Sequence, residues 1–243
     1  MKIAFIGCVQ FSAQALRRLI QHPDAELVGV ITRAASDFNA DFEDLSPIAS
    51  EAGIPIRLSS RNDQSAMVEQ LSAWQPEVVY CFGWSYLLSN EVLRLAPKGV
   101  VGFHPAALPR NRGRHPIIWA LALGLTETAS SFFIMNEQAD AGPIISQAAI
   151  TIAPDDDATS LYASICQTAL EQIDRFTHAL AVDGLTPTPQ DDALANHWRK
   201  RSPADGLIDW RMPAHGIVNL VRALAPPYPG ADCRHPQGLA KVW

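Results

Sequence analysis

The sequence has few cysteines, few charged side chains and no long apolar run. Four cysteines, Cys8, Cys81, Cys166 and Cys233, lie far apart without a CxxC pair, so neither a disulfide framework nor a zinc site is predicted. No apolar run approaches the ~20 residues of a membrane-spanning helix, and the chain opens in a strand pattern, MKIAFIG, rather than in a signal peptide. We therefore expect a cytoplasmic protein without a membrane partner.

Positive charge is scarce as well. A formal net charge of −6 argues against a general binder of nucleic acid or anionic membranes, because both require a basic face. The glycine-rich dinucleotide fingerprint is also missing, since Val9 and Ser12 stand at the later glycine positions of GxGxxG. A plain strand-to-helix turn is favoured there, although such a helix start can hold an anion.

Alternating apolar strands and amphipathic helices predict an α/β fold with a mostly parallel sheet. Strand patterns occupy residues 2–7, 27–32, 54–58, 78–82, 100–103, 129–135 and 143–152, and helix patterns occupy residues 11–20, 46–52, 63–74, 90–95, 116–124, 159–181 and 214–223. The β-α-β opening predicts parallel strands with right-handed crossovers. Residues 34–42 are polar and read as irregular. The acidic run at residues 155–157 is better explained as a solvated helix start than as a metal site.

One loop concentrates titratable and anion-binding side chains. Residues 100–119 leave a buried strand, cross a segment rich in proline and arginine, and enter a helix. The segment carries His104, Arg110, Asn111, Arg112, Arg114 and His115. Loops that leave the carboxyl ends of strands usually hold the chemistry of open α/β sheets, so we predict the reaction centre here.

Asp140 follows a different predicted strand. In a parallel sheet two such turns can be neighbours at one edge, and a carboxylate beside the imidazole of His104 orients it for acid–base work. Each residue also has a plainer explanation, His104 as a structural turn histidine and Asp140 as a turn cap. The spacing leaves both explanations open.

Two motifs carry a family resemblance. His104-Pro-x-x-Leu-Pro-x-x-Arg112-Gly113, followed by Asp140-Ala141-Gly142-Pro-Ile-Ile, resembles the formyltransferase family that uses 10-formyltetrahydrofolate. The resemblance runs from residue 1 to about residue 162, with a weaker match at residues 208–231. It implies a Rossmann-like catalytic domain, placed at residues 1–185, that binds the folate without a metal. Residues 186–243 form a small C-terminal α+β appendage, and their end in a strand pattern suggests a longer functional chain.

The family's catalytic core is an Asn-x-His motif plus an aspartate. His104 and Asp140 match the last two, but Gly102 stands where the family has asparagine. In the family that amide is thought to hold the formyl oxygen as it becomes an oxyanion. We expect Asn111 to replace it, with Ser85 or a backbone N–H as the alternatives.

The resemblance also assigns the two binding sites. The folate is expected to contact Phe82, Gly83, Trp84, Ser85, Leu87, Asn136, Glu137 and Gln138. For the acceptor, Arg110, Arg112, Arg114 and Arg222 suit the diphosphate of a nucleotide, and Trp210 or Tyr228 can pack on a ring. Arg112 and Arg114 have an alternative explanation as residues that brace the loop, and for Arg112 it is at least equally good.

The acceptor predicted from this resemblance is a nucleotide-linked dideoxy amino sugar of the GDP or dTDP type, GDP-perosamine among them. Its formylation serves the synthesis of surface polysaccharide such as the O-antigen of lipopolysaccharide. Three alternatives stay open: a methionyl-tRNA formyltransferase, a formyltetrahydrofolate hydrolase, and a non-catalytic folate- or nucleotide-binding module. Related sugar enzymes are often dimers, so a homodimer is expected by analogy.

Overall fold

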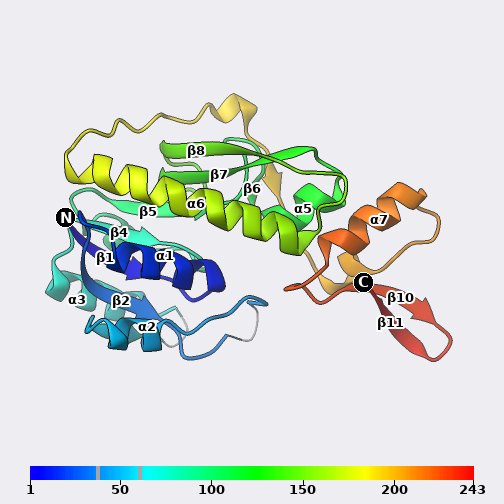
Figure 1. Cartoon of the computed structure of the whole chain (residues 1–243), viewed down its shortest axis with the longest axis horizontal. Helices are drawn as coiled ribbons and strands as arrows, with labels where there is room; N and C mark the ends of the chain where they lie inside the picture. Colours follow the sequence, from blue (N-terminus) through cyan, green and yellow to red (C-terminus); the bar gives the residue numbers. More distant parts are fainter. Residues whose placement is uncertain (37–38, 60–61) are drawn as a thin grey trace. The chain divides into compact units, whose positions relative to one another are not determined.

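A seven-stranded sheet organises the chain in the computed structural model, which describes residues 1–36, 39–59 and 62–243 (Figure 1). Its strand order is β3-β2-β1-β4-β5-β7-β8. The strands are β1 (Lys2–Ile6), β2 (Glu26–Thr32), β3 (Ile56–Leu58), β4 (Val78–Cys81), β5 (Val100–His104), β7 (Glu127–Ile134) and β8 (Ile144–Thr151). The pairs β1–β2, β2–β3, β1–β4 and β4–β5 are parallel, so the predicted mostly parallel α/β sheet is confirmed.

Seven α-helices among the described residues follow the predicted amphipathic patterns. They are α1 (Gln10–Ile20), α2 (Ser46–Glu51), α3 (Gln64–Trp74), α4 (Asn90–Leu93), α5 (Pro116–Ala122), α6 (Ala158–Ala181) and α7 (Ala214–Ala223). Asp63 and Ser89 accept backbone N–H groups at the starts of α3 and α4, which satisfies donors that a helix start leaves open. Part of the irregular segment expected at 34–42, residues 37 and 38, lies outside the described residues.

β7 runs against the direction of β5. Met135, the residue after β7, donates its N–H to the carbonyl of Val100, the first residue of β5. Because the two strands are neighbours in the sheet, this bond requires an antiparallel pair. The argument that two parallel strand ends bring Asp140 to His104 is therefore wrong, since its premise does not hold for β7.

The chain divides into two compact units, each built from separate stretches of sequence. The first comprises Met1–Phe103, Phe132–Ser146 and Ala169–Gln190, and the second comprises His104–Ser131, Gln147–Thr168 and Asp191–Trp243. The domain boundary predicted between residues 185 and 186 stays a prediction.

Aromatic rings form much of the core of the first unit. Phe82 lies against Phe5, Tyr80 and Phe132, with ring centroids 5.6, 5.3 and 5.2 Å apart. Burial of several such rings contributes both apolar area and edge-to-face contacts. The core therefore fixes the end of β4, where the predicted folate segment begins.

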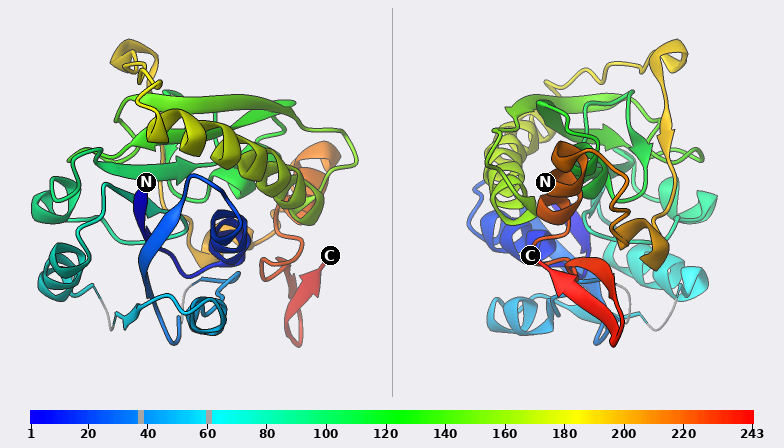
Figure 2. Two further views of the ribbon diagram at one scale, coloured as in Figure 1. Left: turned by 60° about the vertical axis from the view of Figure 1, so that its left-hand side comes forward. Right: turned by 90° about the vertical axis from the view of Figure 1, so that its right-hand side faces the viewer.

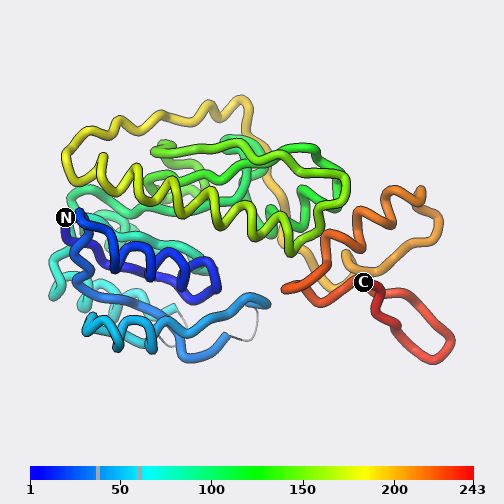
Figure 3. The backbone as a smooth tube through the Cα atoms, viewed as in Figure 1, coloured from blue at the N-terminus to red at the C-terminus, as the bar shows by residue number. Residues whose placement is uncertain are grey.

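The second unit contains short strands that the sequence patterns did not reveal, and a strand near the end of the chain where a strand pattern was predicted. The connector between α6 and α7, which Figure 3 shows in yellow and orange, forms a short strand β9 (His197–Trp198) that pairs in parallel with β6 (Arg112–Gly113). Farther along, β10 (Ala231–His235) and β11 (Gly238–Val242) pair in antiparallel fashion, and Figure 2 shows this hairpin from two sides. A strand of two residues is too short to show a period.

Candidate functional site

His104 is the last residue of β5 and is buried, with 4% of its surface exposed. Its Nε2 lies 2.8 Å from the main-chain oxygen of Asn111. A carbonyl oxygen only accepts hydrogen bonds, so Nε2 carries the proton and, in the neutral ring, Nδ1 holds the lone pair. The structure thus assigns the tautomer of the predicted catalytic histidine.

Asn111 has a backbone conformation and a side chain that are both fixed. Its φ of 62° lies in the left-handed region, which asparagine tolerates better than most residues. Its N–H donates to Asn196 Oδ1 at 2.8 Å, and its Oδ1 accepts from Asn196 Nδ2 at 3.2 Å. The contact with His104 comes from its main chain. Its predicted role as a side-chain donor to the oxyanion stays a prediction.

Gly102 fits its position because neighbouring side chains fill the space that the family's asparagine would need. A Cβ atom at Gly102 would lie 2.8 Å from Met135 Cγ and 2.9 Å from Phe133 Cζ. Both distances are shorter than Cβ contacts normally are. The departure from the family motif is therefore built into the packing of the sheet.

The four arginines predicted to bind a diphosphate differ in their surroundings. Arg112 is 1% exposed and its Nη2 lies 2.8 Å from Asp192 Oδ1, which supports the role of a residue that braces the loop. Arg222 is also engaged by the protein itself: it donates to Asn219 Oδ1 and to the carbonyls of residues 153, 154 and 156. Arg110 and Arg114 are exposed.

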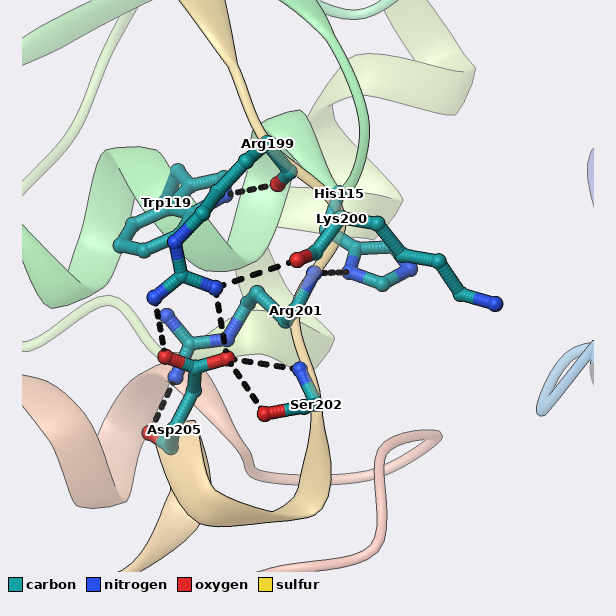
Figure 4. A network of polar contacts seen from close by, with 7 residues as sticks. All are labelled: His115, Trp119, Arg199, Lys200, Arg201, Ser202 and Asp205. Carbon is teal, nitrogen blue, oxygen red and sulfur yellow. Dashed lines mark hydrogen bonds and ion pairs between the residues drawn. The ribbon is translucent and has the colours of Figure 1, made fainter.

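A basic and aromatic network surrounds the start of α5 (Figure 4). The guanidinium carbons of Arg201 and Arg199 lie 4.5 and 5.3 Å from the ring centroid of Trp119. Asp205 pairs with Arg199, and these hydrogen bonds, together with those from Ser202, hold the pKa of its carboxyl well below the usual range. The imidazole Nδ1 of His115 accepts the N–H of Arg201 at 3.2 Å. Burial first, and then Arg114, Arg201 and Lys200, lower the pKa of His115.

The predicted folate segment after β4 divides into core and surface positions. Phe82 is fully buried, which leaves its side chain no access to a ligand. Gly83 has a φ of 69°, and a Cβ there would lie 2.1 Å from Val9 Cγ2, so its glycine serves close packing against the start of α1. Ser85 Oγ donates to Asn39 Oδ1 at 3.2 Å, and Leu87 is 67% exposed.

Trp84 presents an unusual donor in this segment. Its indole Nε1 is buried and has no hydrogen-bond partner among the residues that the structure describes. A buried donor without a partner costs free energy, of the order of 1–3 kcal/mol. The exposed Leu87 lies on the same short segment.

The second predicted folate segment follows β7. Asn136 Oδ1 accepts the N–H of Gln138 at 3.0 Å, and Glu137 forms an exposed ion pair with Arg94 at 2.9 Å. Gln190 donates its side-chain amide to the carbonyls of Asp140 and Gly142, at 2.8 and 2.7 Å. The loop that carries Asp140, which has a φ of 57°, is therefore held in place by the connector after α6.

The predicted catalytic pair falls in different units, with Asp140 in the first and His104 in the second. Their partnership stays a prediction. No periodic pattern predicted the roles of Asn196, Asp192 and Gln190, because each contacts a residue at least 48 positions away. The one available indication was that amide and carboxylate side chains, which readily form hydrogen bonds, are frequent in the polar connector at residues 187–201.

A groove of about 300 Å³ lies along α7 in the second unit. It is lined mainly by aliphatic side chains: Ile217, Val218, Val221 and Ala225, with Asp157, Arg222 and Trp243. The predicted ring-packing residues are elsewhere, with Trp210 66% exposed and Tyr228 half-buried.

In the described part of the chain, no helix is both long and apolar enough to cross a membrane.

Two family models match this chain. One for formyl transferase matches residues 1–175, and one for the formyl transferase C-terminal domain matches residues 200–243. The chain therefore belongs to the formyl transferase family and is a transferase.

Solved structures of several formyltransferases have a similar fold. A 4-N formyltransferase from Francisella tularensis has a TM-score of 0.80 at 15% identity, over 99% of this chain and 96% of that one. An N-formyltransferase from Helicobacter canadensis, in complex with folinic acid and dTDP-3-aminofucose, has a TM-score of 0.73 at 14% identity, over 92% and 80%. Methionyl-tRNA formyltransferase from Clostridium thermocellum has 0.70 at 15% identity, over 97% and 88%. At these identities the likeness shows the fold alone.

Proposed function

We propose that this formyltransferase moves the formyl group of 10-formyltetrahydrofolate to the amine of a nucleotide-linked dideoxy amino sugar. The observation that carries the proposal is the buried imidazole of His104, held at Nε2 by a main-chain carbonyl in a chain of this family. Such a ring has one defined nitrogen, Nδ1, for exchanging a proton with a reactant.

The chemistry of amide formation gives each residue a task. The unprotonated amine attacks the formyl carbon, and the carbon–nitrogen bond to the folate breaks once the amine's proton has reached the leaving nitrogen. His104 takes up that proton at Nδ1 and returns it. The oxygen of the tetrahedral intermediate carries negative charge, and one hydrogen-bond donor to it typically lowers the activation free energy by about 3 kcal/mol. Asp140 orients His104 in this scheme and helps to remove the amine's proton.

The folate side of the reaction is expected at two segments. Trp84 and Ser85, with the exposed Leu87, would hold the pterin from the segment after β4, and residues 136–138 would hold it from the segment after β7. The folinic acid bound to the Helicobacter canadensis enzyme supports a folate as the formyl donor.

The preference for a sugar nucleotide rests on charge and on the comparisons. The chain's net charge of −6 disfavours a large polyanion such as tRNA, whereas a diphosphate needs few cations. Arg110 and Arg114 are exposed on the loop that follows His104 and can supply them. The dTDP-linked amino sugar in the Helicobacter canadensis complex belongs to the same class of acceptor. A role in O-antigen synthesis and a homodimer are parts of the same proposal.

One assay tests the proposal against its alternatives. Purified protein is mixed with 10-formyltetrahydrofolate and with GDP-, dTDP- or UDP-linked amino sugars, or with methionyl-tRNA, and the products are identified by mass spectrometry. We expect a formylated sugar nucleotide, and no product with His104→Ala. Formylated methionyl-tRNA alone would overturn the sugar assignment. Formate release without an acceptor would identify a hydrolase, and no turnover with any acceptor would leave a binding module.

The arginine assignment has its own test. Arg110→Ala and Arg114→Ala should raise the KM for the sugar nucleotide about tenfold, the loss of roughly one charge-assisted hydrogen bond, with the KM for the folate unchanged. An unchanged KM in both variants would remove these arginines from the diphosphate site.

A further inference from the structure

The connector between α6 and α7 contains a stretch, residues 191–199, that lies along the loop after His104. We call this stretch the strap. Its main chain accepts from that loop twice, with Arg112 N–H bonded to the carbonyl of Asn196 and Arg114 N–H to that of Trp198, both at 3.0 Å. These bonds form the β6–β9 pair. The strap therefore fixes the loop over several residues.

The side chain of Asn196 forms further hydrogen bonds with the loop after His104. Its side chain forms two hydrogen bonds with one residue, accepting the N–H of Asn111 at 2.8 Å and donating to its Oδ1 at 3.2 Å. Asn111 has a φ of 62°, a conformation that costs free energy unless its surroundings hold it. The amide of Asn196 thus supports a backbone conformation of Asn111 that the chain would not adopt readily by itself.

The residue held in this way also contacts His104, through the carbonyl of its other peptide group. The main-chain oxygen of Asn111 lies 2.8 Å from His104 Nε2. Three groups are thereby connected in series: the amide of Asn196, the main chain of Asn111 and the imidazole of His104. Each link is a hydrogen bond of ordinary length within the second unit.

We infer that Asn196 is a positioning residue, which acts through Asn111 to keep the proton of His104 on Nε2 and the lone pair on Nδ1. The inference rests on the proposed function, because it matters for catalysis only if His104 exchanges a proton with the reactants. The hydrogen bond that one ring nitrogen of a histidine makes fixes the tautomer of the ring. Loss of the correct tautomer is costly, about 10⁴-fold for a serine protease.

The first test is a spectroscopic measurement on the protein without substrates. Correlation of ¹H and ¹⁵N in the imidazole rings should show His104 with its proton on Nε2, exchanging slowly with solvent. In Asn196→Ala we expect that proton to exchange at least about tenfold faster and the other tautomer to appear. Asn196→Asp keeps an oxygen for the N–H of Asn111, so it should restore the slow signal. A wild-type ring protonated on Nδ1, or an unchanged signal in Asn196→Ala, would overturn the inference.

A control variant separates the amide of Asn196 from the general order of the strap. Asp192→Asn weakens the ion pair with the buried Arg112 but leaves both side-chain bonds of Asn196 in place. It should lower the melting temperature and leave the Nε2–H signal of His104 unchanged. Equal loss of the signal in Asp192→Asn and Asn196→Ala would show that strap order alone is responsible, which contradicts a specific role for Asn196.

Turnover supplies the second readout. In Asn196→Ala we expect kcat to fall about tenfold or more while the KM values for folate and acceptor stay unchanged, since Asn196 is not among the residues proposed to bind either one. A change in KM with constant kcat would contradict a positioning role. Wild-type protein that formylates no acceptor would count against the proposed function alone, because the spectra do not depend on turnover.

Discussion

At the scale of single residues, Gly102 shows how a family motif can be altered by packing. Asparagine at this position would have to share space with Met135 and Phe133, whose atoms already lie within 3 Å of where its Cβ would be. Methionine can move, but the phenylalanine ring belongs to the strand next in the sheet. The side-chain amide of the family's asparagine therefore cannot be introduced at residue 102 without displacing these neighbouring side chains.

We therefore expect Gly102→Asn to destabilise the protein by roughly 1–3 kcal/mol through overpacking, without an increase in kcat. Urea unfolding and turnover of the variant measure the two effects. Gly53→Asn is the matched control: a Cβ at Gly53 meets nothing within 4 Å, and asparagine tolerates its φ of 66°. A Gly102→Asn variant that is as stable as wild type and faster would refute this explanation.

His115 makes the stability of the protein depend on pH. Its pKa is lowered in the folded chain by burial and by nearby cations, from an ordinary value of 6.5. Between the two values the unfolded chain binds more protons, so the free energy of unfolding falls as the pH is lowered through this range. Above about pH 7.5 the histidine is neutral in both states and contributes no pH dependence.

His115→Asn should consequently lose less stability than wild type between about pH 7.5 and about pH 5.5. Asparagine tolerates the φ of 57° and can still accept the N–H of Arg201. Urea unfolding at both pH values gives the difference. If the two proteins lose stability equally, the lowered pKa of His115 is not a source of the pH dependence.

At the scale of elements, the segment after β4 serves both the core and the surface. Phe82 completes the aromatic core, and Gly83 turns the chain against α1. From Trp84 on the side chains are half-buried or exposed, up to Leu87. A rigid start and an accessible end suit a segment that must present a binding surface without moving.

Two alanine variants should separate these roles. Phe82→Ala removes a buried ring and should cost about 3–5 kcal/mol of unfolding free energy. Leu87→Ala should cost less than about 0.5 kcal/mol, because its side chain is exposed, yet should weaken folate binding measured by calorimetry. Unchanged folate affinity in Leu87→Ala would remove this residue from the predicted site.

At the scale of the whole molecule, the resemblance assigns catalysis to residues from both compact units. His104 belongs to the second unit, and Asp140 belongs to the first. Each is held by the connector after α6, Asp140 through Gln190 and His104 through Asn111 and Asn196. A connector without helix or strand periodicity thus holds both predicted catalytic loops.

A double-mutant cycle tests the predicted partnership of these residues. If Asp140 stabilises the imidazolium of His104, the effects of His104→Ala and Asp140→Asn on kcat/KM should be strongly non-additive, as in catalytic groups that act as a unit. The double variant should then be about as slow as His104→Ala alone. Effects that multiply would show that the two residues act independently.

The hydrophobic pattern of the sequence was sufficient to predict the main strands of the sheet. The runs at residues 2–7, 78–82 and 100–103 are apolar apart from Lys2, as in buried parallel strands, and β1, β4 and β5 lie there. The paired motifs at His104 and Asp140 were enough for the family. Both signals are local, because a strand's burial pattern and a motif's residue types are present in the sequence itself.

Other features were decided by contacts between residues distant in sequence. Asn111 and Asn196 are 85 positions apart in the sequence. Arg112 and His197, the first paired residues of β6 and β9, are also 85 positions apart. The direction of β7 follows from its pairing with β5, and the ion pair of Arg112 follows from a carboxylate on the strap. The sequence by itself determined the strands, the helices and the family motif, because these depend on neighbours in the chain. Only the tertiary structure decided which nitrogen of His104 carries the proton, because that depends on an acceptor whose position is set by a distant segment.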